Sequence, residues 1–112
     1  PEEIEGAALE GLVAQHLRAW NDYSGADHTI GYWRTRSGTE VDFIVYGPKH
    51  FWAIEVKNST RVNPHDLKAL KSFLKDYPEA QAFFLYRGQE KLTIDNITCL
   101  PCEEFLKQLI PT

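Results

Sequence analysis

Methionine is absent from this 112-residue chain, and cysteine occurs only twice. Because position 1 is not methionine, we expect the sequence to be a domain cut from a longer protein. The two cysteines, Cys99 and Cys102, are too few for the disulfide framework of a small secreted domain. Their C-L-P-C spacing would suit a redox or zinc motif, but the histidines of the chain supply no zinc-ligand pattern. We therefore interpret the two cysteines as buried packing residues.

Long hydrophobic runs and excess basic charge are missing as well. No stretch approaches the roughly 20 apolar residues that a membrane helix needs. The opening PEEIEGAALEG also lacks the charged and apolar blocks of a signal peptide. We therefore expect a cytoplasmic protein without a membrane partner. The formal net charge of −4 argues against a stand-alone duplex-binding protein, although it does not exclude nucleic acid as a partner.

What remains is an ordinary globular composition, 43% hydrophobic and 25% charged, which predicts one α/β domain over residues 1–112. Apolar residues at helical spacing predict a first helix over 4–20. Aromatic and β-branched segments alternate with turn residues and predict strands. The expected order is helix 4–20, strands 28–35, 39–46 and 51–58, helix 63–78, strands 80–88 and 91–99, and a short helix after Pro101.

The second helix has the clearest start signal. Asn63 suits the N-cap, Pro64 the first helical position, and Asp66 lies near the positive end of the helix.

The strands 39–46 and 51–58 predict a hairpin around the loop G-P-K-H. If Tyr46 lies opposite Phe51, the numbers of paired residues sum to 97, and Asp42 faces Glu55. Strand alternation then gives one apolar face, with the polar residues gathered at the far end of the other face. The apolar face is expected to hold Val41, Phe43, Val45, Trp52, Ile54 and Val56.

Two opposed carboxylates repel each other and raise each other's pKa, so Asp42 and Glu55 cost stability unless a cation lies between them. Mg²⁺ binds one or two carboxylates and completes its octahedron with water and substrate oxygens. Lys57 would then offer a positive charge to a phosphate or an attacking water. A purely structural alternative stays open. In it, Glu40 and Lys57 form a solvated cross-strand salt bridge, and Asp42 and Glu55 are tolerated surface charges.

Other charged residues are candidates around this site. Glu10 lies on the border of the first helix's apolar stripe, where it could supply a third acid. Arg34 and Arg36 neighbour the Asp42 strand and are candidates for phosphate contact. Arg61 precedes a basic ridge on the second helix, which is either a solvated face or a rail for a phosphate backbone. The ridge consists of Lys68, Lys71 and Lys75.

Four segments together resemble the C-terminal domain of a family of prokaryotic AAA-type ATPases, a domain placed in the PD-(D/E)XK, or restriction-endonuclease-like, superfamily. They are GAALEGLVAQHL, YWRTRSGTEVDFIV, AIEVKNSTRV and DLKALKSFLKDYPEAQAFFLY, and they cover nearly the whole chain. The resemblance implies an αβββαβ core with a mixed sheet flanked by helices. It also implies an ATPase domain on the N-terminal side of the same longer chain.

For the site, the resemblance implies an acid on the first helix, an Asp on the second strand and Glu-X-Lys on the third. These correspond to Glu10, Asp42, Glu55 and Lys57, and Val41 stands where the superfamily name has proline. In active members of the superfamily, Mg²⁺ or Mn²⁺ is held by the Asp, the Glu and the carbonyl of X, here Val56. The implied activity is that of a metal-dependent nuclease with DNA as the expected substrate, and the alternative is an inactive docking or regulatory module.

Overall fold

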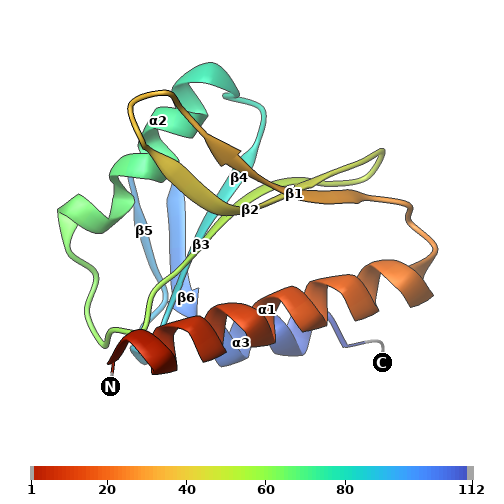
Figure 1. Ribbon diagram of the computed structural model, residues 1–112, viewed down its shortest axis with the longest axis horizontal. Helices are drawn as coiled ribbons and strands as arrows, with labels where there is room; N and C mark the ends of the chain where they lie inside the picture. The colour runs from red at the N-terminus through yellow and green to blue at the C-terminus, as the bar shows by residue number, and fades with distance from the viewer. Residues whose placement is uncertain (1, 111–112) are drawn as a thin grey trace.

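The computed structural model describes the backbone of residues 2–110 and the side chains of residues 4–110. Its elements follow the expected order, with one addition near the C-terminus (Figure 1). They are α1 (Glu2–Ser24), β1 (Thr29–Arg34), β2 (Glu40–Tyr46), β3 (Phe51–Val56), the 3-10 turn η1 (Pro64–Leu67), α2 (Lys68–Asp76), β4 (Gln81–Tyr86), β5 (Leu92–Ile94), β6 (Ile97–Pro101) and α3 (Cys102–Gln108).

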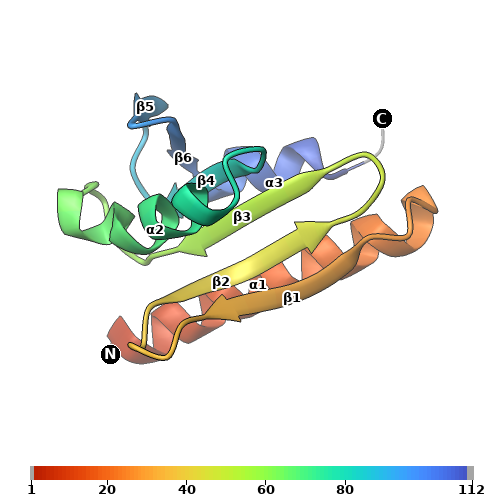
Figure 2. The same cartoon turned by 90° about the horizontal axis from the view of Figure 1, so that it is seen from above.

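The six strands form one mixed sheet in the order β1-β2-β3-β4-β6-β5. β1, β2 and β3 form an antiparallel meander, and β4 joins β3 in parallel after the crossover through η1 and α2. β6 is parallel to β4, and β5 is antiparallel to β6. The helices α1 and α3 lie together on one face of this sheet and α2 on the other, as Figures 1 and 2 show. The expected α/β class with a mixed sheet flanked by helices is confirmed.

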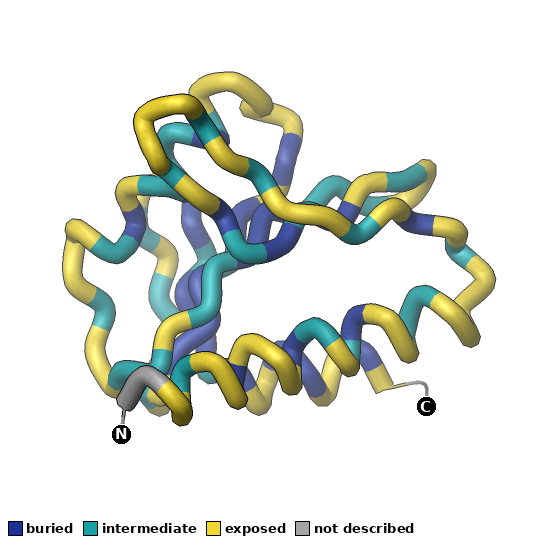
Figure 3. The backbone as a smooth tube through the Cα atoms, in the orientation of Figure 1, coloured by how far each residue is buried: buried dark blue, intermediate teal, exposed yellow. Residues whose placement is uncertain are grey.

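Helix coverage of both faces creates two apolar cores, and the buried residues gather along the central strands between them (Figure 3). The first core joins α1 and α3 to Phe43, Val45 and Ile54. The second joins α2 to Val41, Ala53 and β4. Both faces of the hairpin are therefore apolar over most of their length.

The predicted hairpin register is confirmed over four consecutive pairs. Phe43 lies opposite Ile54 and Tyr46 opposite Phe51, with the two pairs between them in step. The expectation of one uniform apolar face is wrong, because Val41 belongs to the second core while Phe43 belongs to the first.

A β-bulge explains why Val41 changes face. Between the pairs Gly31–Ile44 and Trp33–Val41, β1 advances by two residues while β2 advances by three. β2 therefore carries one extra residue in the Asp42–Phe43 step, and alternation is interrupted there. Bulges of this kind re-aim side chains, and the residue affected here is Asp42.

Three local expectations need correction. The single strand expected over 91–99 is a hairpin of β5 and β6, because Asp95 and Asn96 have positive φ angles of 50° and 67° and form a tight turn. His16, whose place in the apolar stripe of helix 4–20 predicts a packed core residue, is half-buried instead, and its Nδ1 lies 2.9 Å from the Leu12 carbonyl oxygen. Val56, expected to be almost wholly buried, is also half-buried.

Other local expectations are confirmed. Asn63 and Asp66 form a capping box at the start of η1, with Pro64 in the first turn. Cys99 and Cys102 are buried and free, and burial raises the pKa of both thiols. Among residues 2–110, no helix is long and apolar enough to cross a membrane.

Candidate functional site

The site lies where β2 and β3 stop pairing. The ladder between the two strands ends at Phe43 and Ile54, and beyond it side chains take over the hydrogen bonding. The Asp42 N–H donates to Glu55 Oε1 at 3.0 Å, and the Val56 N–H donates to Asp42 Oδ2 at 2.9 Å. Each carboxylate thus accepts a backbone hydrogen bond from the other strand. We call the gap between the strands at Asp42 and Glu55 the fork.

These two hydrogen bonds place both carboxyl groups close to the plane of the sheet, because ladder N–H groups point along the sheet toward the neighbouring strand. Asp42 and Glu55 therefore meet in the fork even though their side chains border different hollows. Asp42 lines a hollow of about 240 Å³ with Glu10 and Arg34. Glu55 lines another of about 390 Å³ with Val56 and Lys57. The bulge at Asp42 accounts for this arrangement, which simple strand alternation does not predict.

Burial and mutual repulsion govern the protonation of the two acids. Burial, together with repulsion from the neighbouring Asp42 carboxylate, raises the pKa of Glu55 to about 9. Burial also raises the pKa of Asp42, although its hydrogen bond from the Val56 N–H acts in the opposite direction. At neutral pH the pair therefore retains a proton that a free glutamate and aspartate would have lost.

Glu10 approaches the fork from helix α1. Its pKa is raised by burial and by the nearby charges of Asp42 and Glu40. Within the part of the chain that the structure describes, however, no three His, Cys, Asp or Glu side chains are grouped closely enough to hold a metal. Two carboxylates are nevertheless sufficient protein ligands for Mg²⁺.

Lys57 follows the fork on the α2 side and is held by an acid that sequence reasoning assigned only to helix capping. Its Nζ lies 2.6 Å from Asp66 Oδ1. The same carboxylate accepts the Asn63 N–H through Oδ2 at 3.0 Å. The Asp66 side chain is 5% exposed, whereas that of Lys57 is 49% exposed. The capping signal was visible in the sequence, but the contact with Lys57 depends on how η1 packs beside β3.

The structural alternative, a Glu40–Lys57 salt bridge, is wrong, because each residue pairs with a different partner. Glu40 pairs with Arg34 at 2.6 Å, on the neighbouring strand β1. Lys57 pairs with Asp66 instead. Neither pair crosses the fork.

The remaining basic candidates are spread over the surface. Arg34 lies near Asp42, since both line the smaller hollow. Arg36 is exposed in the turn between β1 and β2, and Arg61 is exposed in the connection after β3. Of the predicted basic ridge, Lys68 borders the Glu55 hollow and Lys71 pairs with Asp95 at 2.8 Å.

A second polar group, missed by sequence reasoning, joins α1 to the hairpin. His28 Nε2 and His50 Nδ1 lie 3.1 Å apart. His28 stacks on Trp20, and Trp52 stacks on the same indole. The His28 N–H donates to Asn21 Oδ1, which anchors the end of α1 to the start of β1. The group is best explained as packing between these elements.

A protein-family model matches this chain, and no curated protein matches it. The match covers residues 5–105, which include the fork, Lys57 and all six strands. The chain therefore belongs to the family described as Domain of unknown function (DUF4143).

Proposed function

We propose that this domain is a divalent-metal-dependent phosphodiester hydrolase, a nuclease with the PD-(D/E)XK arrangement of residues. The observation that carries the proposal is the meeting of the Asp42 and Glu55 carboxyl groups in the fork. Because the two groups are buried together, the pair still holds one proton at neutral pH. A cation there would replace the proton and reverse the sign of the repulsion.

The donor set fits Mg²⁺ or Mn²⁺, because both ions prefer oxygen ligands. Asp42 and Glu55 would supply carboxylate oxygens. The Val56 N–H points to Asp42, and the carbonyl of an extended residue points to the same side as its N–H, so the Val56 carbonyl is expected to face the fork. Water and substrate oxygens would complete the coordination.

A metal held by Asp42 and Glu55 would lower the pKa of a coordinated water and polarise a phosphate. Lys57 would orient that water or stabilise charge that develops on the phosphate, and Asp66 keeps the ammonium group beside the Glu55 hollow. Glu10 would assist the metal or a water from the α1 side, where it lies close enough to Asp42 for the two charges to interact. Arg34, Arg36 and Arg61 are proposed contacts for the nucleic acid backbone.

DNA is the proposed substrate, and an ATPase domain of the same longer chain is the proposed partner. Both proposals rest on the resemblance of the sequence to ATPase-linked nuclease-like domains. The formal net charge of −4 supports dependence on such a partner, because a stand-alone duplex-binding protein is expected to be strongly basic.

A second function, that of an inactive docking or regulatory module, is favoured by one specific observation. The Asp42 and Glu55 carboxylates each accept a backbone N–H across the fork. They therefore satisfy donors that the diverging strands would leave unpaired, which is a structural role that needs no metal.

Thermal unfolding with Mg²⁺ or Mn²⁺ separates the two functions, because metal binding to the folded state raises the melting temperature by linkage. We expect a rise at millimolar metal that is lost in Asp42→Asn and Glu55→Gln and retained in Lys57→Ala. The amide variants keep an oxygen for each backbone N–H, so a lost response reports on ligation. A wild-type protein without any response, or an unchanged response in Asp42→Asn, would favour the docking module.

A further inference from the structure

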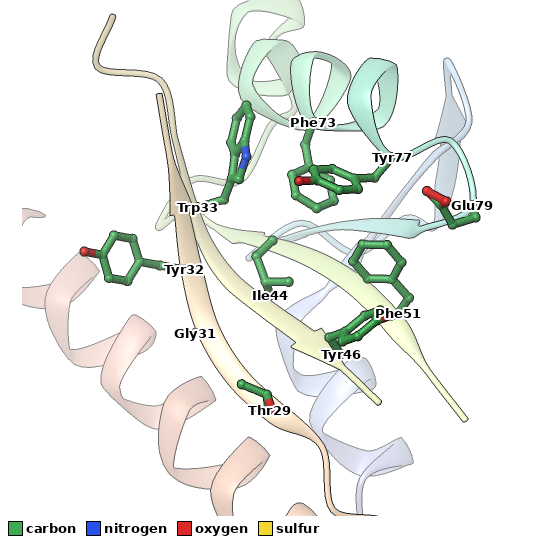
Figure 4. A pocket seen from close by; sticks show the side chains of 10 residues that line it. All are labelled: Thr29, Gly31, Tyr32, Trp33, Ile44, Tyr46, Phe51, Phe73, Tyr77 and Glu79. Atoms are coloured by element: carbon green, nitrogen blue, oxygen red, sulfur yellow. The ribbon is translucent and has the colours of Figure 1, made fainter. Parts of the chain in front are cut away.

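On the α2 side of the sheet, aromatic side chains from four elements line an open hollow of about 510 Å³ (Figure 4). Trp33 comes from β1, Tyr46 from β2, Phe51 from β3 and Tyr77 from the end of α2, with Phe73 behind them. The volume lies within the range of about 300–1,000 Å³ that is usual for small-molecule sites.

Phe73 and Tyr77 stack, with 29° between their ring planes, and form one wall of this hollow, whereas the other ring pairs stand nearly perpendicular. The angle between ring planes is 81° for Tyr46 and Phe51, 72° for Phe51 and Tyr77, and 86° for Trp33 and Phe73. Rings that stand perpendicular to one another enclose a space of similar width in all directions, which we call a box. Two parallel rings enclose a narrow, flat space, which we call a slot. A box suits a compact, rounded ligand group, and a slot suits a flat nucleobase or guanidinium group.

Charge further restricts the ligand. Among the lining residues that the structure describes, Glu79 is the only charged one, and none is Lys, Arg or His. Glu79 lies at one end of the hollow, next to Tyr77 (Figure 4). Aromatic faces carry negative electrostatic potential, so the rings and the carboxylate both favour a cation.

The lining is also accessible. Tyr46 is 60% exposed and Tyr77 is 41% exposed, although both are large aromatic residues that contact Phe51. Two exposed tyrosines that frame a hollow leave ring surface for a ligand to cover.

We propose that this hollow binds a small organic molecule through an alkylammonium head group. The head group lies among Trp33, Tyr46, Phe51 and Tyr77, and Glu79 provides the counter-charge at the rim. Neither Asp42 nor Glu55 lines this hollow, so the proposal does not depend on nuclease activity.

The test uses choline chloride as the probe and compares it with its uncharged isostere, dimethylbutanol, in which carbon replaces the quaternary nitrogen. Titrations of the chain at constant ionic strength are followed by NMR shifts of the Trp33 indole and neighbouring ring protons. We expect saturable choline binding that is roughly fivefold or more tighter than binding of the isostere. Tyr77→Leu and Glu79→Gln should each weaken choline binding, whereas Tyr23→Leu, on helix α1, should leave it unchanged.

Tyr77→Leu keeps an apolar side chain at an exposed position, and circular dichroism verifies that each variant is folded. Equal affinity for choline and dimethylbutanol would overturn the proposal, since the hollow would then be merely apolar. Absence of saturable choline binding in the folded wild-type chain would overturn it as well.

Discussion

Lys57 Nζ and Asp66 Oδ1 lie 2.6 Å apart, so the lysine of the candidate site is tied to the residue that completes the capping box of η1. Asp66 is almost fully buried and serves two partners, because its other oxygen accepts the Asn63 N–H. Any change at Lys57 therefore affects helix capping as well as the chemistry of the fork.

From this relationship we expect Lys57→Ala to lower the melting temperature without metal, because it leaves the Asp66 carboxylate without its cation. The loss should be about 1 kcal/mol, since the lysine end of the pair is half-exposed. Asp66→Ala should cost more, about 1–2 kcal/mol, because the capping box is lost too. Chemical denaturation measures both values, and Lys71→Ala, which breaks a surface pair with Asp95, is the matched control. Equal stability of Lys57→Ala and wild type would contradict this prediction.

The protonation of the fork predicts a pH-dependent stability. The folded pKa of Glu55, about 9, lies above its ordinary value of 4.5, so the folded protein retains a proton that the unfolded chain releases. The stability that this proton contributes is complete below pH 4.5 and is lost progressively as pH rises toward 9.

Glu55→Gln should therefore match the wild type near pH 4 and exceed its stability by more than about 1 kcal/mol at pH 8. Asp42→Asn should behave similarly, because the pKa of Asp42 is also raised and the amide still accepts the Val56 N–H. Denaturation of all three proteins across this pH range, with EDTA present, measures the differences. Strong destabilisation of Asp42→Asn would instead identify Asp42 as a structural anchor.

If Mg²⁺ binds in the fork, it must displace the retained proton. We expect the apparent affinity for Mg²⁺ to increase as pH rises from 6 toward 8.5, with net release of about one proton. Calorimetric titration in two buffers with different ionisation enthalpies measures the released proton directly. Affinity that does not change with pH would show that the metal binds elsewhere on the protein.

The core makes a prediction that is separate from activity. Ile54, on β3, is completely buried in the core beneath α1 and α3. Ile54→Ala should therefore lower the free energy of unfolding by about 2–5 kcal/mol through lost burial and a cavity. Ile30, on β1, is only half-buried in the same core, and Ile30→Ala should cost less than half as much. Denaturant midpoints measure both, and comparable losses would mean that the core is not centred on β3.

Local sequence determined much of this architecture. The Gly47–His50 loop and the alternation beside it were sufficient for the register between Phe43 and Ile54, because a short hairpin leaves few ways to pair its strands. The capping role of Asn63 was equally readable, since an N-cap depends on residues within one turn. The same register, extended by one pair, placed Asp42 opposite Glu55.

Only the tertiary structure decided how these residues are presented. The bulge that moves Val41 to the second core arises from pairing with β1, ten residues away along the chain at Gly31. The Lys57–Asp66 pair requires η1 to pack beside β3, and the raised pKa of Glu55 requires the fork to be buried. The aromatic hollow combines residues from Trp33 to Tyr77. Contacts between distant segments depend on packing and burial, which a local pattern of residues does not encode.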